Sequence, residues 1–264
     1  MSRIKRVFEE LKDKGEGVLI GYLTLGDPDI SSSTEHFIAL AKHADILEIG
    51  MPFSDPIADG PTIQAAMDRA LTSGVTTNDA FKTASDLRAS GVMRPIVFMT
   101  YYNIVLQYGE DMFLQQCSES GVDGLLVSDL PLEESESIVA GCKKHGIDPI
   151  FLIAPTTPPE RARKIAAVGT GFLYLISLLG VTGERKSVAA KTLEIIESTQ
   201  RIVGEIPLAV GFGISRPEHV KEIIAAGAEG VVVGSAFVNL AAKHGSSAGP
   251  YLEELSKDLK EGTR

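Results

Sequence analysis

The amino-acid sequence predicts a (β/α)8 barrel, an α/β fold in which eight parallel strands close into a cylinder inside a ring of helices. Eight short apolar runs rich in Val, Ile and Leu alternate with stretches of helical periodicity, and no GxGxxG follows the first run. Nearly continuous apolar runs suit strands that are covered on both faces. A doubly wound open sheet is the structural alternative, but eight repeats without a dinucleotide motif favour closure. We expect residues 1–264 to form a single barrel domain.

The eight predicted strands are spread along the whole chain. They lie in the runs VLIGYLTLG from Val18, ILEIG from Ile46, IVFMTY from Ile96, GLLVSDLP from Gly124, PIFLIAP from Pro149, FLYLISLLG from Phe172, PLAVGFG from Pro207 and GVVVGSAF from Gly230. The segment MSRIKRVFEELKDKG predicts an extra N-terminal amphipathic helix before the first strand. Its apolar face holds Ile4, Val7, Phe8 and Leu11.

Helical patterns fill the intervals between the strands. Two of them run from Ser31 to Ala44 and from Pro217 to Ala226, and Pro61 suits the first position of a third helix. The buried face of this third helix is predicted to hold Ile63, Ala66, Met67, Ala70 and Leu71. Glycines expected to end helices in a left-handed conformation are Gly91, Gly121, Gly146 and Gly227.

Charge and composition exclude several classes of function. A formal net charge of −10 argues against nucleic acid and anionic membranes as partners, because both attract clustered Lys and Arg. Cys117 and Cys142 form no CxxC pair and are expected to pack inside helices, in a reducing, cytoplasmic compartment. The histidines lack HxH or HExxH spacing, so we expect surface positions and no metal site for His36, His43, His145, His219 and His244.

The first catalytic candidate is Glu48, inside the run ILEIG. Barrel active sites lie at the C-terminal ends of the strands, and an unpaired carboxylate is costly in a strand that is buried on both faces. Such surroundings raise the pKa of a carboxyl group and make it usable as a general acid. The alternative is a strand acid that forms an ion pair with a neighbour.

The turn MPFSDPIADGPTIQ follows this strand and carries Asp55 and Asp59 among three prolines. A stiffened acidic loop at this end of a barrel suits catalysis, whereas Asp in a Pro-rich turn is also ordinary turn chemistry. The residues alone leave both interpretations open for each Asp.

Glycines at three adjacent strand ends predict a phosphate site. They are Gly183 in LLGVTGER, Gly211 and Gly213 in VGFGIS, and Gly234 before Ser235 in VVVGSAF. Glycine lets backbone N–H groups approach a phosphate, and Ser235 is expected to open a short helix whose N-terminus favours an anion. The polar segment from Leu179 to Ala190 is predicted to be a lid, with a merely long connection as the alternative.

The segment LEIGMPFSDPIADGPTIQ, from Leu47 to Gln64, closely resembles the signature of the tryptophan synthase α subunits. Similar matches follow in the family's order, namely YLTLGDP at Tyr22, SDLPLEES at Ser128, YLISLLGVTG at Tyr174, GFGIS at Gly211 and VVVGSA at Val231. The resemblance covers essentially the whole chain. It implies a lyase of tryptophan biosynthesis that cleaves indole-3-glycerol phosphate to indole and glyceraldehyde 3-phosphate.

The resemblance also implies residue roles. Glu48 matches the general acid/base, and Asp59 matches the carboxylate that binds the indole N–H. The phosphate site would comprise Gly183, Gly213, Gly234 and Ser235, and the indole pocket Tyr22, Tyr101, Ile153, Tyr174 and Phe212. In the closed state, Thr182 of the lid would meet Asp55.

Two features depart from the family's pattern. Tyr22 stands where Phe is frequent, and Leu178 and Leu179 begin the lid where some members carry a polar or basic residue. These residues put the polarity of the pocket and the behaviour of the lid in question, but not the reaction.

The resemblance further implies an αββα heterotetramer with a β subunit that carries pyridoxal phosphate and receives indole through a tunnel. This chain itself is expected to need no cofactor and no metal. Exposed apolar residues suit an interface, so the expected contacts are Pro52, Phe53, Ile57 and Tyr102.

Three alternatives stay open at this point. Another phosphate-handling barrel, such as a sugar-phosphate isomerase, would share the glycines but not Glu48, Asp55 and Asp59. A non-catalytic allosteric paralogue would have no need of Glu48 and Asp59. A stand-alone indole-3-glycerol phosphate lyase would keep all of these residues and lack only the partner.

Overall fold

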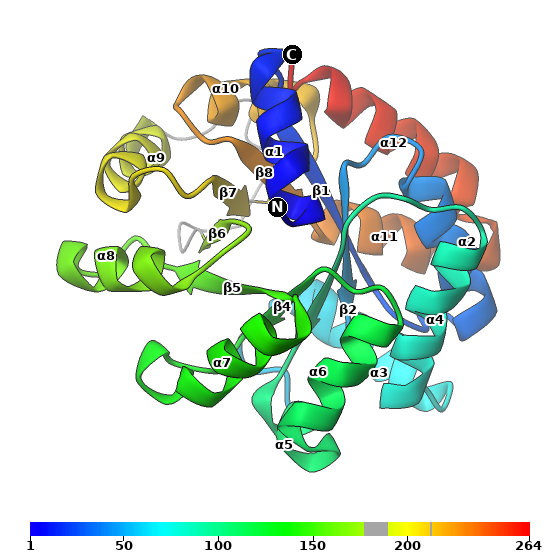
Figure 1. Cartoon of the computed structure of the whole chain (residues 1–264). Coiled ribbons are helices and arrows are strands. Elements are labelled where there is room, and N and C mark those ends of the chain that lie inside the picture. Colours follow the sequence, from blue (N-terminus) through cyan, green and yellow to red (C-terminus); the bar gives the residue numbers. More distant parts are fainter. Residues whose placement is uncertain (177–189, 212) are drawn as a thin grey trace.

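The computed structural model describes residues 1–176, 190–211 and 213–264. Its strands form a closed parallel barrel in which each strand pairs with the next and β8 pairs with β1 (Figure 1). The strands are β1 Val18–Thr24, β2 Ile46–Gly50, β3 Ile96–Thr100, β4 Gly124–Val127, β5 Asp148–Ile153, β6 Leu173–Ile176, β7 Leu208–Gly211 and β8 Gly230–Val233. The predicted (β/α)8 barrel is therefore confirmed.

Helices connect successive strands and surround the barrel (Figure 1). They are α1 Arg3–Asp13, α2 Ile30–Leu40, α3 Pro61–Thr72, α4 Thr77–Ala89, α5 Tyr102–Tyr108, α6 Glu110–Glu119, α7 Glu136–His145, α8 Pro159–Val168, α9 Ala190–Val203, α10 Pro217–Ala225, α11 Ser235–His244 and α12 Gly249–Glu261, with the 3-10 turns η1 Leu132–Glu134 and η2 Gly245–Ser247. Within the described ranges, none of these helices is long and apolar enough to cross a membrane.

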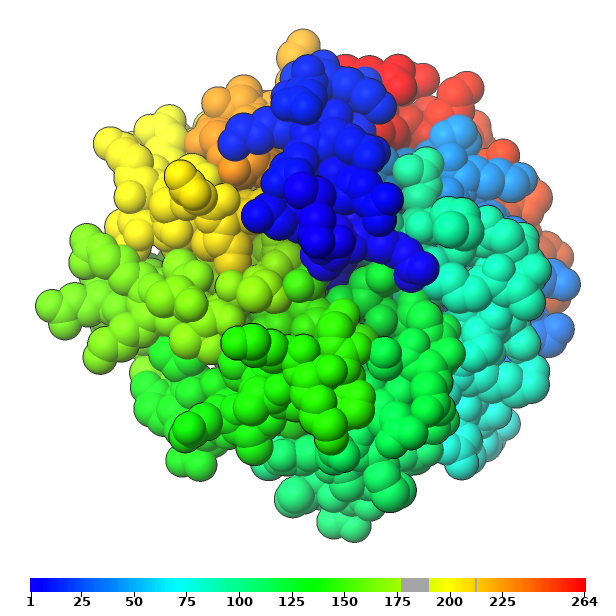
Figure 2. Space-filling model, in the orientation of Figure 1, coloured from blue at the N-terminus to red at the C-terminus, as the bar shows by residue number. Residues whose placement is uncertain are grey.

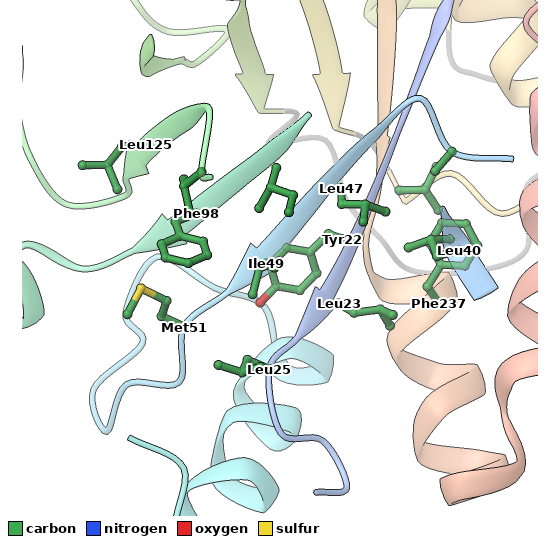
Figure 3. Packing of buried hydrophobic residues seen from close by; sticks show 14 of the residues in the cluster. Tyr22, Leu23, Leu25, Leu40, Leu47, Ile49, Met51, Phe98, Leu125 and Phe237 are labelled. Carbon is green, nitrogen blue, oxygen red and sulfur yellow. The ribbon is translucent and has the colours of Figure 1, made fainter. Parts of the chain in front are cut away.

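Two layers of apolar side chains hold the barrel together. An inner cluster fills the cylinder with residues such as Val18, Ile46 and Val97, and Ile4 and Phe8 of α1 close it at the N-terminal ends of the strands. Figure 2 shows side chains of α1 over the centre of this face. An outer cluster fills the space between strands and helices, and Figure 3 shows Leu23, Leu40, Leu47 and Phe237 within it. Active sites of such barrels lie at the C-terminal ends of the strands, the end opposite to α1.

The helix boundaries follow from local chemistry. Asp29 accepts a hydrogen bond from the Ser32 backbone N–H at 2.9 Å and so caps α2, and Pro61 opens α3 as predicted. Gly91, Gly121, Gly146 and Gly227 have φ angles of +84°, +81°, +72° and +101°, which confirms the left-handed helix ends. Helix α2 ends at Leu40, before the predicted Ala44.

Three surface or core assignments from the sequence were wrong. His36 and His219 are 1% and 9% exposed, because the C-terminal helix α12 packs against both α2 and α10 and so belongs to the ring that covers them. Leu71 of α3 is 36% exposed, although its helix neighbours Ala66 and Ala70 are buried. The apolar pattern of one helix therefore does not show which of its sides the neighbouring helices cover.

Candidate active site

Glu48 projects into the barrel near the C-terminal end of β2. Its side chain lies on the same face as Ile46 of the inner cluster, because side chains alternate along a strand, while Leu47 and Ile49 belong to the outer cluster. The residue is 1% exposed, and its Oε1 atom has no hydrogen-bond partner in the described part of the chain.

This environment changes the acidity of Glu48. Burial, and after it the negative charge of Asp59, raises the pKa of the Glu48 carboxyl to about 8. Among the described residues no cation forms an ion pair with Glu48, so this part of the chain gives no support to a salt-bridged strand acid. The group is therefore mainly protonated at neutral pH and can both donate and take up a proton.

Two tyrosines flank Glu48. Tyr22 of β1 pairs with Glu48 in the strand register, and its hydroxyl shares a 3.3 Å hydrogen bond with that of Thr24. Tyr174 of β6 belongs to the rim of the inner cluster. Burial, together with the charges of Glu48 and Asp59, raises the pKa of both phenols, so both are neutral at physiological pH.

Glycines make room for these two phenol groups. A Cβ atom on Gly50 would lie 2.1 Å from the Tyr22 hydroxyl, and one on Gly211 would lie 2.3 Å from the Tyr174 hydroxyl. Any larger residue at either glycine would displace its tyrosine. Gly50 was not singled out in the sequence, and its position two residues after Glu48 on the inward face was the available signal.

Asp59 lies in the loop between β2 and α3 and is held by Tyr101. The Tyr101 hydroxyl donates a 2.6 Å hydrogen bond to Asp59 Oδ2 and accepts one of 3.1 Å from the Ala58 backbone N–H. Burial raises the pKa of Asp59, and the hydrogen bond from Tyr101 opposes that rise. Asp55 is exposed and accepts a 2.7 Å hydrogen bond from the Ser54 hydroxyl.

The predicted phosphate residues that the structure describes lie after β7 and β8, which are neighbours in the barrel. Gly213 has a φ angle of +31°, and Gly234 precedes the ten-residue helix α11, which begins at Ser235. A Cβ atom on Gly234 would lie 3.3 Å from the Tyr22 ring. The N-terminus of α11 therefore adjoins the tyrosine beside Glu48, and free backbone N–H groups there favour an anion.

One predicted pocket residue faces the wrong way. Ile153 belongs to the outer cluster, whereas its neighbour Leu152 packs against the inner cluster and pairs in register with Tyr174. Leu152 is therefore the residue of β5 that faces the barrel interior, and counting alternate residues from Ile150 would have found it. The remaining predicted positions, Leu178, Leu179, Thr182, Gly183 and Phe212, lie outside the described residues.

Other reactive groups stand apart from this site. The described part of the chain holds no group of three or more His, Cys, Asp or Glu side chains that could bind a metal ion. Cys117 and Cys142 are buried on α6 and α7, as expected for packing residues, and burial raises the pKa of the Cys142 thiol to about 12.

Known proteins share both the sequence and the fold of this chain. The sequence profile described as tryptophan synthase alpha chain matches residues 8–263. A tryptophan synthase alpha chain of Methanosarcina mazei is 49% identical over 261 residues, which cover 98% of this chain and 94% of the relative. One from Methanocaldococcus jannaschii is 47% identical and covers 96% of this chain and 89% of the relative.

Solved structures agree. A chain of the tryptophan synthase complex from Pyrococcus furiosus superimposes with a TM-score of 0.86 at 41% identity, covering 92% of this chain and 98% of that one. A chain of tryptophan synthase from M. tuberculosis, in an open form, gives a TM-score of 0.90 at 34% identity, with 100% and 99% covered. The profile, the near full-length relatives and the barrel with its buried Glu48 together establish that this chain belongs to the tryptophan synthase alpha chain family, whose activity is the cleavage of indole-3-glycerol phosphate.

Proposed function

We propose that this chain performs that cleavage with Glu48 as general acid and base and Asp59 as the partner of the indole N–H. The reaction adds a proton to the ring carbon that carries the glycerol chain, which gives an indolenine-like cation. The hydroxyl on the adjacent glycerol carbon then loses its proton and becomes an aldehyde. The electrons of the broken carbon–carbon bond return to the ring, so one proton enters and one leaves.

The observation that carries this proposal is the state of Glu48. A carboxyl group with a pKa of about 8 is protonated often enough to donate to the ring carbon and basic enough to take the hydroxyl proton afterwards. The unpartnered Oε1 atom fits this role, because a donor to the carboxylate would lower its pKa and leave it ionised at neutral pH, without a proton to give to the ring carbon.

Asp59 supplies the opposite charge. Positive charge develops on the indole ring after protonation, and a carboxylate that accepts the ring N–H stabilises this charge most in the transition state. Tyr22 and Tyr174 stay neutral beside it, so Asp59 provides the negative charge without competition from a phenolate.

The substrate's phosphate would bind at Gly213, Gly234 and Ser235, joined by Gly183 of the lid. The N-terminus of α11 offers backbone N–H groups and the positive end of a helix dipole, which lets an acidic protein hold an anion. Because Gly234 adjoins the Tyr22 ring, a ligand there could reach Glu48 with its indole end.

The proposed partner is a β subunit in an αββα heterotetramer. Ile57 is 84% exposed and follows the partly buried Pro52 and Phe53 in the loop that carries Asp59. A partner on this rim would order the loop together with the lid, with Thr182 meeting Asp55. We further propose that pyridoxal phosphate belongs to the β subunit, that this chain needs no cofactor and that it acts in the cytoplasm.

The test is indole release from indole-3-glycerol phosphate by the purified chain, followed by titration with its cognate β subunit. Coupling between the two is expected to raise the rate by about 5- to 150-fold. Full activity of the pure chain without a response to the β subunit would favour a stand-alone lyase. No indole under either condition would refute the proposed reaction.

A further inference from the structure

We propose that Tyr101 is a positioning residue that holds the Asp59 carboxylate by one oxygen and leaves the other open to the indole N–H. This inference rests on the proposed role of Asp59 and extends it to a second residue. The sequence suggested only that Tyr101 lines the pocket, and its hydroxyl carries a more specific function.

The Tyr101 hydroxyl makes two hydrogen bonds with opposite roles. It donates to Asp59 Oδ2 at 2.6 Å and accepts from the Ala58 backbone N–H at 3.1 Å. Since Tyr101 is 1% exposed and directly follows β3, its ring is fixed to the barrel wall. Two consecutive residues of the loop are thus attached to one atom of a rigid element.

The ring of Tyr101 adds a third attachment. It stacks on Phe53 with centroids 4.9 Å apart and planes inclined by 25°. Between these attachments Ser54, Asp55 and Ile57 are exposed, and the Pro56 carbonyl accepts the Asp59 backbone N–H at 3.1 Å. Tyr101 therefore holds the part of the loop that carries Asp59, next to an exposed part that carries Asp55.

The orientation of Asp59 follows from these contacts. In the described part of the chain, Oδ2 accepts the Tyr101 hydroxyl while no hydrogen bond reaches Oδ1, and Gln64 holds the Asp59 backbone carbonyl at 2.8 Å. A carboxylate with one oxygen fixed presents the other in one direction, which is what recognition of a single N–H requires.

Tyr101 also favours the ionised form of Asp59. Burial raises the pKa of Asp59, and a donor to its carboxylate counters that effect. Burial and Asp59 in turn raise the pKa of Tyr101, so its hydroxyl keeps its proton and remains a donor. The acceptor side of the same hydroxyl is occupied by Ala58, which leaves the proton directed at Asp59.

The test is Tyr101→Phe, which removes the hydroxyl and keeps the ring that stacks on Phe53. We expect kcat for indole release to fall about 10- to 100-fold, as for loss of a hydrogen bond to a charged group, with a smaller change in KM. The acidic limb of the pH profile should move to higher pH, because burial then acts on Asp59 unopposed. The matched control is Tyr108→Phe, whose hydroxyl bonds Asn78 outside the site at 3.2 Å.

Two further measurements make the test specific. Carbon-13 NMR titration of the Asp59 carboxyl, assigned with Asp59→Asn, should show a higher pKa in Tyr101→Phe than in the wild type and in Tyr108→Phe. In a double-mutant cycle, Tyr101→Phe should add little to the loss caused by Asp59→Asn, because Tyr101 acts through Asp59. An unshifted carboxyl titration, or a full additional loss in the Asp59→Asn background, would overturn the inference.

A failure of the proposed function looks different. If Asp59→Asn kept full kcat, the catalytic role of Asp59 would be wrong, and the inference that depends on it would fall at that step. The carboxyl titration in Tyr101→Phe does not depend on turnover. It would show separately whether Tyr101 holds the group.

Discussion

Two buried acids lie near opposite ends of β2 and differ in their hydrogen bonds. Asp45 directly precedes the strand and is surrounded by hydrogen-bond donors. Glu48 lies near the other end and, among the described residues, is not. Asp45 Oδ2 accepts the Leu19 backbone N–H at 2.8 Å and the Lys260 ammonium at 2.8 Å. Glu48 is 1% exposed, and its Oε1 atom has no partner among the described residues. The two acids are three residues apart.

Two more acids at the N-terminal end of the barrel resemble Asp45. At the N-terminal end, Asp123 accepts the Ile96 backbone N–H at 2.9 Å, and Glu229 accepts that of Leu208 at 3.0 Å. Each acid thus binds a backbone donor near the start of a neighbouring strand, as Asp45 does. At the C-terminal end, Glu48 Oε1 lacks such a partner among the residues that the structure describes. Partners turn a buried acid into a structural group, and their absence leaves a reactive one.

The largest expected effect is on turnover at the C-terminal end. Glu48→Gln keeps the size and shape of the side chain but cannot transfer a proton, so kcat should fall on the order of 10² to 10⁴-fold. Binding of glycerol 3-phosphate, measured by calorimetry, should be unchanged. Near-full indole production by the purified variant would remove Glu48 from the mechanism.

The next effect is a pH dependence of stability to which Glu48 contributes. Its pKa is raised to about 8 in the folded chain from an ordinary value of 4.5, so between these values the unfolded state ionises first. Stability is therefore lost as pH rises through this window, by about 3 kcal/mol at pH 7. Relative to the wild type, Glu48→Gln should gain free energy of unfolding between pH 4.5 and 8. If the difference in free energy of unfolding between the two proteins, measured with urea, stayed constant across that pH range, the raised pKa would be contradicted.

At the N-terminal end, Asp45→Asn should affect stability and not chemistry. The Lys260 ammonium, whose side chain is only 12% exposed, would lose the carboxylate of Asp45 at 2.8 Å and keep that of Glu16 at 3.4 Å. We expect a loss of about 2 kcal/mol in urea unfolding, below the cost of breaking a fully buried pair. The control is Glu253→Gln, which removes the exposed partner of Lys42 and should cost much less. If kcat per folded molecule fell in Asp45→Asn, the separation of a structural N-terminal end from a catalytic C-terminal end would be wrong.

The sequence predicted the barrel and Glu48 for one physical reason. Strands buried on both faces are apolar throughout, so both the eight runs and the acid inside one of them stand out. The same property hides the direction of each side chain, and the pocket prediction named Ile153 although Leu152 faces the interior. His36 was misplaced because α12, which packs on its helix, comes from the far end of the chain.

The arrangement around Asp59 could not be read from the sequence either. Tyr101 lies 42 residues further along the chain, directly after the next strand of the barrel, and neither residue signals the other. The parallel pairing of β2 with β3 brings the end of β3 beside the loop that follows β2. The family resemblance named both residues as parts of a pocket, but it did not connect them.

The smallest expected effects compare two glycines, one from each end of the barrel. Gly227 has a φ angle of +101° and open space where a Cβ atom would lie, whereas Gly234 has a φ angle of −116° and would place its Cβ atom 3.3 Å from the Tyr22 ring. Gly227→Ala should therefore destabilise the fold by about 1 kcal/mol through backbone strain alone and leave ligand binding unchanged. Gly234→Ala should keep stability and weaken glycerol 3-phosphate by about 5-fold, roughly 1 kcal/mol, because the methyl group stands where backbone N–H groups meet the phosphate. Thermal unfolding and calorimetric titration of both variants measure the two effects side by side. Unaltered binding in Gly234→Ala would show that phosphate affinity does not reside at the end of β8, and weaker binding in Gly227→Ala would show that the comparison does not separate stability from binding.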